Sequence, residues 1–405
     1  MSREERINNN LFRPSEQQFC RLLEDLIRIP SYPGISRQET ELATYIRDFF
    51  SGIGIEAELF PVVDGRCNVM ARLQGSGGGK NLILNGHLDT VPPYDLKDAL
   101  KMRKVGRELY GRGTADMKGA LACMMLAMSR LKASGTRLAG DVVFIGVIDE
   151  EMTSAGTCAL LKGGLAADGA VVGEPMDGNI GIGHKGLQWF EFRIHGKAVH
   201  GGEQENGINA IRQAMRLINR LEEVLIPSLS RRVHPVIGAS SLNYGYIQGG
   251  FQPSTVAGEC LLQIDRRWIP GEKYETVVSE FSDLIAELER EDPEFTCDFS
   301  VMENSMMSDG LIHEGFEIDI NDPLVVAAAE ASFFITGKHP DKAPFKAWTD
   351  AGLISTYGKI PTIVFGPGML KSAHTRDEMI NIDQALDFVG IYTSLCIRFC
   401  GLEKL

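Results

Sequence analysis

LILNGHLDTVPP, residues 82–93, is the stretch of sequence that decides the fold. Its first three residues, Leu82–Leu84, are apolar and β-prone, which predicts a short strand buried on both faces. The chain then turns at Asn85-Gly86 and presents His87 and Asp89. An imidazole and a carboxylate two residues apart, just beyond a buried strand, suit a metal ligand and the group that orients it. The same pattern is also common in surface turns, so the metal interpretation depends on further ligands.

Length, charge and cysteine usage narrow the class of protein. The chain has 405 residues, of which 44% are hydrophobic and 23% charged, and it is longer than one hydrophobic core usually serves. A net charge of −13 and a pI of about 5.2 argue against nucleic acid or an anionic membrane as the main partner. Eight cysteines without C-x-x-C spacing predict reduced thiols. The polar N-terminus, MSREERINNN, and the lack of a membrane-length apolar run predict a cytoplasmic protein without a secretory signal.

Helices and short apolar strands alternate at both ends of the chain. This alternation predicts an α/β domain with a mostly parallel sheet covered by helices on both faces. Helical spacing of apolar residues and runs of β-prone residues locate the elements. The predicted helices cover 15–28, 39–54, 118–134, 323–334 and 383–399, and the predicted strands cover 57–61, 68–73, 82–84, 142–148, 170–173 and 362–365.

The hydrophobic period changes at about Gly186. In WFEFRIHG, residues 189–196, apolar and polar side chains alternate, which predicts a half-exposed strand of an antiparallel sheet. The order strand-helix-strand-strand-helix-strand follows, and this order is typical of ferredoxin-like domains. We therefore predict a domain of residues 187–303, inserted into a larger domain of residues 1–186 and 304–405.

Acidic and imidazole side chains follow the predicted strands of the larger domain. The carboxyl ends of such strands border the crevice where ligands bind. Imidazoles and carboxylates without thiolates suit Zn²⁺, Co²⁺ or Mn²⁺. The carboxylates outnumber what one four-coordinate ion needs, so we predict two divalent ions about 3.5–4 Å apart. Taken singly, each group could be an ordinary acidic turn. The residues are His87, Asp116, Glu150, Glu151, Glu174 and His374.

GHLDTVP, GRGTADMKG, DEE, VGEP and SAHTRDE occur in this order between Gly86 and Glu378. Together these motifs resemble the M20 family of metallopeptidases and deacylases, which includes acetylornithine deacetylase and succinyl-diaminopimelate desuccinylase. The resemblance covers nearly the whole chain. It implies a zinc-peptidase-like catalytic domain, with the inserted domain acting as a lid and as the contact of a homodimer.

The resemblance also implies a role for each motif residue. Asp89 would fix the tautomer of His87, and Glu150 would be the general base that takes a proton from a water between the two ions. His200, in GKAVHGG of the inserted domain, would reach across the dimer to stabilise the oxyanion. The first ion would be held by His87, Asp116 and Glu174, and the second by Asp116, Glu151 and His374, with Asp116 bridging.

Three positions concern the substrate. Arg267, in the stretch IDRRWIPGE, matches the arginine with which family members bind a substrate carboxylate, a role that suits its fork geometry. Arg266 is the alternative, because strand alternation turns only one of the two toward the site. Ser254 stands where many relatives carry asparagine, which leaves N-acyl, N-formyl and N-carbamoyl substrates open. Gly368 could bring a backbone N–H close to the substrate.

We therefore predict a two-metal amidohydrolase that acts on a small N-acyl amino acid or a related N-acyl amine. A dipeptidase or carboxypeptidase of the same family is the first alternative. A non-catalytic metal-binding protein would lack a ligand or the base, and a serine hydrolase would carry a G-x-S-x-G motif, which this sequence does not contain. The acyl group, the amine and the physiological metal stay open. Closure of the inserted domain over the ions is expected to hinge near residues 186 and 303.

Overall fold

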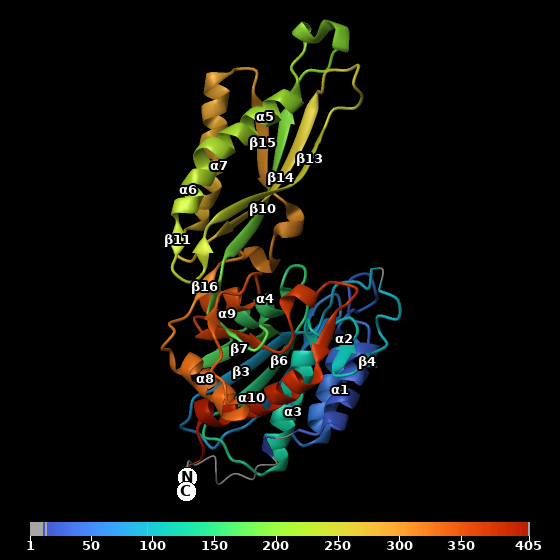
Figure 1. Cartoon of the computed structure of the whole chain (residues 1–405), viewed down its shortest axis with the longest axis vertical. Helices are drawn as coiled ribbons and strands as arrows, with labels where there is room; N and C mark the ends of the chain where they lie inside the picture. The colour runs from blue at the N-terminus through green and yellow to red at the C-terminus, as the bar shows by residue number, and fades with distance from the viewer. Residues whose placement is uncertain (1–10, 13, 95, 404–405) are drawn as a thin grey trace. The chain divides into compact units, whose positions relative to one another are not determined.

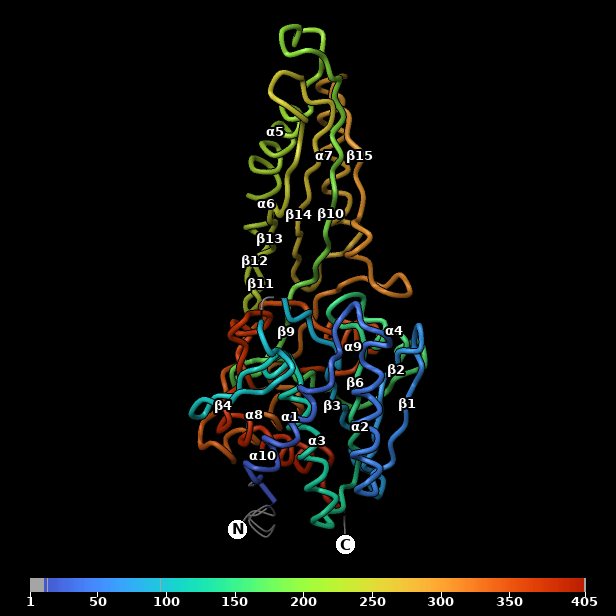
Figure 2. The backbone as a smooth tube through the Cα atoms, turned by 90° about the vertical axis from the view of Figure 1, so that its right-hand side faces the viewer, coloured from blue at the N-terminus to red at the C-terminus, as the bar shows by residue number. Residues whose placement is uncertain are grey.

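The computed structural model describes residues 11–12, 14–94 and 96–403, and the chain divides into two compact units (Figures 1 and 2). The larger unit comprises the chain up to Gly183, Glu317–Phe345 and the chain from Thr349, and the inserted unit comprises His184–Phe316 and Lys346–Trp348. The prediction that the chain lacks a secretory signal was made from its first ten residues, and these lie outside the described residues. None of the described helices is long and apolar enough to cross a membrane.

The inserted unit begins and ends beyond the predicted range of 187–303. The segment after residue 303 stays with this unit because it is bonded to the unit's first strand. Gln188 Nε2 donates to the carbonyl oxygen and the hydroxyl of Ser305, at 2.6 and 2.8 Å. The N–H of Leu187 donates to the carbonyl of His313 at 3.0 Å. These contacts join two segments that hydrophobic periodicity alone does not connect.

The larger unit is built on a mixed sheet with a parallel centre. In the described part of the chain, eight strands form this sheet in the order β1-β2-β6-β3-β7-β18-β8-β17. β6, β3, β7 and β18 run parallel to one another, whereas β2 pairs antiparallel with β6 and β1 pairs antiparallel with β2 at one edge. The predicted α/β architecture is confirmed. The strands are β1 (Glu56–Val63), β2 (Arg66–Leu73), β3 (Leu82–His87), β6 (Val142–Val147), β7 (Gly169–Pro175), β8 (Ile180–Gly181), β17 (Lys342–Ala343) and β18 (Thr362–Gly366).

Helices cover both faces of this sheet. Leu82 and Leu84 of β3 are fully buried in the main core, together with apolar residues of α1, α2, α3, α8 and α10. Ile83 points to the other face, where it lines a cavity with residues of α4. The sheet is therefore buried on both sides, as its continuous apolar strands require. The helices are α1 (Glu16–Arg28), α2 (Thr40–Gly52), α3 (Lys118–Ala133), α4 (Ala155–Lys162), α8 (Pro323–Thr336), α9 (Ala351–Thr356) and α10 (Ile382–Cys400).

Helices α1, α2, α3, α8 and α10 confirm the predicted helices to within a few residues. Helices α4 and α9 and a three-stranded sheet were not predicted. These elements are too short to show a hydrophobic period: α4 has 8 residues and α9 has 6. The small sheet pairs β19 (Met379–Asn381) with β5 (Glu108–Tyr110) and β4 (Arg103–Val105).

The inserted unit has the predicted ferredoxin-like order. Its sheet is fully antiparallel, in the order β13-β14-β10-β15, so the first strand of the unit lies between the third and the fourth. Phe190, Phe192 and Ile194 of β10 point into a core shared with α5 and α7, which pack together. The main elements are β10 (Gly186–His195), α5 (Ala210–Arg220), α6 (Ile226–Arg231), β13 (Ser241–Gly249), β14 (Glu259–Trp268), α7 (Tyr274–Glu291) and β15 (Thr296–Val301).

Gly366, at the end of β18, lies too close to β7 to accept a side chain. A Cβ at this position would stand 2.1 Å from the carbonyl oxygen of Gly173 and 2.7 Å from that of Glu174. We predict that Gly366→Ala forces β18 away from β7 and lowers the free energy of unfolding by about 1–3 kcal/mol in urea titrations. Gly52→Ala is the matched control, because a Cβ on Gly52 has no neighbour within 4 Å among the described residues. Equal stability of the two variants would contradict this packing account.

Candidate metal centre

The predicted ligands of the larger unit gather at the carboxyl ends of its parallel strands. His87 is the last residue of β3, Glu174 is the next-to-last residue of β7, and Glu150 and Glu151 follow β6 after two residues. His87 and Glu174 are buried, with 2% and 4% of their surfaces exposed. The polar side chains thus occupy the edge of the sheet where the apolar strands end, which is the usual ligand position in open α/β sheets.

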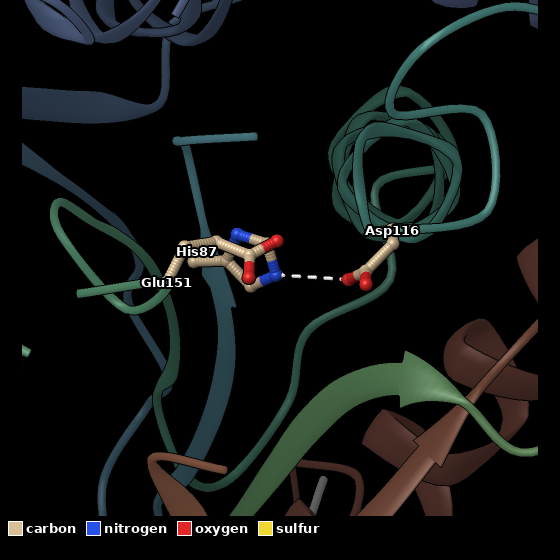
Figure 3. A group of neighbouring side chains, drawn as sticks. All are labelled: His87, Asp116 and Glu151. Carbon is tan, nitrogen blue, oxygen red and sulfur yellow. Dashed lines mark hydrogen bonds and ion pairs between the residues drawn. The ribbon is translucent and has the colours of Figure 1, made fainter. Parts of the chain in front are cut away.

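Asp116 connects two imidazoles. It lies in the loop before α3 and is 7% exposed. Its Oδ1 is 3.0 Å from Nε2 of His87, an arrangement that Figure 3 shows, and its Oδ2 is 3.2 Å from Nε2 of His374. The carboxylate therefore presents one oxygen to each side. This is the geometry that a bridging ligand of two cations requires.

Each imidazole also faces a second carboxylate. Nε2 of His87 lies 3.5 Å from Oε1 of Glu174, and Nε2 of His374 lies 2.9 Å from Oε1 of Glu151. The structure thus brings together two groups that share Asp116. One contains His87 and Glu174, and the other contains Glu151 and His374. These are the two ligand sets that the motif resemblance implies.

Asp89 contacts its neighbours differently from the prediction. We expected its carboxylate to fix the tautomer of His87, but the nearer atom to Nδ1 of His87 is the carbonyl oxygen of Asp89, at 2.9 Å, while Oδ1 is 3.6 Å away. The carboxylate instead accepts the N–H groups of Glu150 and Glu151, at 3.2 and 3.0 Å. Buried backbone donors need an acceptor, and Asp89 is the group that supplies it here. Asp89 therefore orients His87 through its backbone and the Glu150-Glu151 loop through its side chain.

A buried ion-pair network supports the same loop and was not predicted. Asp149 has a φ of 70°, in the left-handed region that few non-glycine residues adopt. Its Oδ1 accepts a hydrogen bond from Arg66 at 2.7 Å, and Arg66 also pairs with the buried Glu39 at 2.5 and 2.8 Å. These contacts hold Asp149, and with it the direction of Glu150. Nothing in the sequence around residue 66 signals this role.

Two further buried acids lie close to the centre. Asp350 is fully buried, accepts a hydrogen bond from Thr157 at 2.6 Å, and burial raises its pKa to about 6. Glu378 pairs with Arg112 at 2.5 Å, and both side chains are buried. Glu378 and Arg112 belong to the motifs SAHTRDE and GRGTADMKG, so membership of those motifs was the signal that could have identified them. Asp350 carried no comparable signal.

The charges of the centre perturb one another strongly. Burial acts to lower the pKa of His87, but the negative charges of Glu174 and Asp116 outweigh it and raise this pKa well above its usual range. Hydrogen bonds to Asp116 and Glu151 raise the pKa of His374 to about 10. Burial, and then the charge of Asp116, raise the pKa of Glu174 well above its usual range. Carboxylates that are held this close together without enough positive charge attract protons or cations.

The residues present fit divalent metal ions. The donor atoms of His87, Asp116 and Glu151 all lie within 4.8 Å of one another, and so do those of His87, Glu150 and Glu174. Oε1 of Glu174 is buried and, within the described residues, accepts no hydrogen bond. An acceptor aimed into such a centre is expected where a cation is the partner. Imidazole and carboxylate donors are those that Zn²⁺, Co²⁺ and Mn²⁺ accept.

The predicted substrate residues Arg267, Ser254 and His200 belong to the inserted unit. Alternation along β14 separates the two arginines: Arg266 is fully buried and pairs with Glu272 and Glu280, whereas the side chain of Arg267 is 30% exposed on the other face.

His200 and Ser254 are both exposed and lie on adjacent segments, because the N–H of Gly201 donates to the Ser254 carbonyl at 2.7 Å. In the larger unit, Gly368 lies beside the loop of Asp116. A Cβ on Gly368 would stand 3.3 Å from Cα of Ala115. The N–H of Gly368, however, donates to Oε1 of Gln384 at 2.8 Å, so this donor is engaged within the chain rather than directed to a substrate.

Comparisons with known proteins identify the family of the chain. A family model described as "Peptidase family M20/M25/M40" matches residues 83–398. The N-formyl-4-amino-5-aminomethyl-2-methylpyrimidine deformylase of Halalkalibacterium halodurans is 30% identical, with 96% of each chain covered. The acetylornithine deacetylase of Myxococcus xanthus is 29% identical, over 90% of this chain and 93% of that one.

Among solved structures, the aminopeptidase PepT of Bacillus cereus superposes with a TM-score of 0.80 at 22% identity, covering 95% of this chain and 99% of that one. This likeness supports the fold, while the family model and the relatives identify the group of proteins. The chain therefore belongs to peptidase family M20/M25/M40 and is a hydrolase of that family.

Proposed function

We propose that the protein is a two-metal amidohydrolase that removes a small acyl group from an amine. The observation that carries this proposal is the position of the Asp116 carboxylate, which presents Oδ1 to His87 at 3.0 Å and Oδ2 to His374 at 3.2 Å. A carboxylate between two separate imidazole–carboxylate pairs is suited to hold two cations at once.

The charges of the centre support two cations rather than one. Four carboxylates, those of Asp116, Glu150, Glu151 and Glu174, have donor atoms in the two clusters around His87. When these groups are ionised, their four negative charges are balanced by two divalent cations and only half balanced by one. An unbalanced charge in a buried site is costly. Zn²⁺ is the ion we propose, and Co²⁺ and Mn²⁺ are alternatives that also accept imidazole and carboxylate ligands.

Glu150 is the residue we propose as general base. Burial, and then the charge of Glu174, raise the pKa of Glu150 well above its usual range, so its carboxylate has an increased affinity for a proton. Divalent ions, when bound, would acidify a water molecule and polarise the amide carbonyl. Glu150 takes the proton from the attacking water. It then delivers this proton to the amine nitrogen as the C–N bond breaks.

The substrate class we propose is a small N-acyl amine. Among relatives that cover at least nine tenths of the chain, one is named as a deformylase, one as a deacetylase and one as a probable succinyl-diaminopimelate desuccinylase. We assign the substrate carboxylate to Arg267, whose side chain is 30% exposed and binds Asp265 through Nε at 3.0 Å, because Arg266 is committed to the core. Lys185 lies nearby in the same unit, where burial and the charge of Arg267 lower its pKa. This positive region favours an anionic group on the substrate.

We also propose a homodimer that forms through the inserted unit. Strand β13 is an edge strand of its sheet, and it carries the exposed side chains of Tyr246 and Ile247. Phe251, just beyond this strand, is 95% exposed. A long edge strand with apolar side chains is a template for pairing with a second chain. In such a dimer, His200 would serve the centre of the partner subunit as an oxyanion donor.

Glu150→Gln tests the assignment of the base. Glutamine keeps the shape of the side chain but cannot take a proton, so we expect both metal ions to remain bound while kcat falls by about 10²–10⁴-fold. Metal content by emission spectroscopy and steady-state kinetics are the measurements. Glu151→Gln is the matched variant and should lose the metal ion bound with His374. If Glu150→Gln loses a metal ion instead, Glu150 is a ligand; an unchanged kcat would show that it is not the base.

A substrate panel tests the acyl-amine assignment and the role of Arg267 together. We expect N-formyl and N-acetyl amino acids and amines to be hydrolysed faster than dipeptides. Arg267→Met should raise KM by roughly 10–100-fold for substrates that carry a carboxylate, the loss expected for a charged hydrogen bond, and leave carboxylate-free amides unaffected. Arg266→Met should lower stability instead, since it leaves Glu272 and Glu280 buried without this partner. If dipeptides were the best substrates, the peptidase alternative would be favoured. If Arg267→Met raised KM equally for substrates with and without a carboxylate, Arg267 would not be the residue that binds the carboxylate.

Mixed dimers test the shared site. A His200→Ala chain keeps the metal centre, and a Glu150→Gln chain keeps His200, so each is inactive in its own homodimer. In a heterodimer of the two, one site combines an intact centre with an intact His200. We therefore expect up to about half of the wild-type activity per heterodimer to return, measured on doubly tagged, purified heterodimers. No return of activity in verified heterodimers would contradict a site shared between subunits.

A further inference from the structure

The carboxylate of Glu378 collects the backbone N–H groups of the loop that carries Asp116. Its Oε1 accepts three of them, from Gly113 at 2.9 Å, Ala115 at 3.1 Å and Asp116 at 3.1 Å. Its Oε2 accepts a hydrogen bond from Arg112 at 2.5 Å. Glu378 is 1% exposed and Arg112 is 2% exposed, so water does not compete for these contacts.

This single oxygen determines the backbone geometry around Asp116. Three N–H vectors that converge on one point fix the path of the loop, and the side chain of Asp116 follows from that path. The loop is also tight on its other side: Gly113 has a φ of 86°, and a Cβ there would lie 3.1 Å from atoms of Thr90 and Lys118. Without Glu378, three buried donors would lose their acceptor, which is a costly state.

Glu378 also joins this loop to the segment that carries His374. The two residues are four positions apart, in the motif SAHTRDE. The carbonyl of Glu378 accepts the N–H of Gly111 at 3.2 Å, and Arg112 reaches the carbonyl of Thr375 at 3.4 Å. Contacts therefore run in both directions between the segment of His374 and the loop of Asp116. A displacement of one segment would displace the other.

The guanidinium of Arg112 offsets the buried charge of Glu378. A carboxylate placed behind Asp116 would otherwise add to the negative charge of the centre, and its ionised form would be unfavourable there. Both carboxylate oxygens of Glu378 are therefore used, one by the three N–H groups and one by Arg112, whereas a glutamine would offer a single acceptor oxygen.

We propose that Glu378, paired with Arg112, is the positioning residue that holds the Asp116 carboxylate between the two metal positions. This inference rests on the proposed function, because it assumes that Asp116 is shared by two ions. It assigns to Glu378 no contact with the substrate or the metal. Mutation of a residue that holds a metal ligand in place typically lowers metal affinity or activity by about 10–100-fold.

The test compares Glu378→Gln, Glu378→Ala and Arg112→Gln with the wild-type chain. Each full-length protein is stripped of metal and titrated with Co²⁺, followed by calorimetry and by the visible absorption of the bound ion, while circular dichroism reports folding. We expect both Co²⁺ affinities to fall by about 10–100-fold in Glu378→Ala and by less in Glu378→Gln, which keeps one acceptor oxygen. The absorption band should change in both, because the ligand geometry changes.

Asp141→Asn is the matched control. Asp141 also accepts a backbone N–H, from Gly75 at 2.9 Å, and pairs with an arginine, Arg72, at 3.6 Å. It precedes β6, whereas Glu150 follows this strand, so the two positions are separated by about 20 Å of extended chain. This variant should bind Co²⁺ with wild-type affinity and an unchanged spectrum.

Asp116→Asn separates failure of this inference from failure of the proposed function. If Asp116→Asn binds both ions as the wild type does, the shared carboxylate is wrong, and with it the proposed function. If Asp116→Asn loses both ions while the folded Glu378 variants keep wild-type affinity and spectrum, only the positioning role is overturned. If both Glu378 variants fail to fold, Arg112→Gln decides: weaker Co²⁺ binding with an altered band supports the role, and wild-type binding contradicts it.

Discussion

One carboxylate, that of Asp116, lies between two imidazoles that come from distant parts of the chain, 3.0 Å from His87 and 3.2 Å from His374. This arrangement demands that a strand end, a helix start and a late loop meet at one point. The parallel sheet provides the strand end, since β3 delivers His87 at its carboxyl edge next to β6 and β7. The carboxylates gathered at this point outnumber the imidazoles, so the protein side chains alone leave the centre negatively charged. This excess negative charge is the reason that the centre needs cations.

The loops at this edge are held by buried hydrogen bonds and ion pairs rather than by regular secondary structure. Asp89 accepts the N–H groups of Glu150 and Glu151, Arg66 holds Asp149, and Glu378 accepts the N–H groups around Asp116. Metal ligands need supporting contacts of this kind, because their donor atoms must be placed to within a fraction of an ångström. Acidic residues therefore also surround the proposed ligands, where they support the loops that carry them. Among these supporting residues, arginines supply part of the compensating charge.

Much of the fold and the ligand set could be predicted because both depend on local patterns. The apolar run of β3, the helical spacing in α3 and the alternation in β10 are visible in the sequence, and the motif residues stand at the ends of those elements. The partners of Glu39, Arg66 and Asp350 could not be predicted, because these contacts join segments far apart in the chain and leave no periodic signal. The contact of Asp89 with His87 was expected through the wrong atom, since sequence spacing cannot distinguish a carbonyl from a carboxylate oxygen. The motif resemblance assigned the substrate arginine to Arg267 with Arg266 as the alternative, and the burial of Arg266 favours Arg267.

The most direct test of the shared carboxylate is anomalous X-ray diffraction from crystals of the zinc-loaded protein, recorded on both sides of the zinc absorption edge. The account predicts two peaks about 3.5–4 Å apart, one beside His87 and Glu174 and the other beside Glu151 and His374, with one oxygen of Asp116 directed to each. A single peak at full occupancy, or two peaks of which only one contacts Asp116, would contradict it.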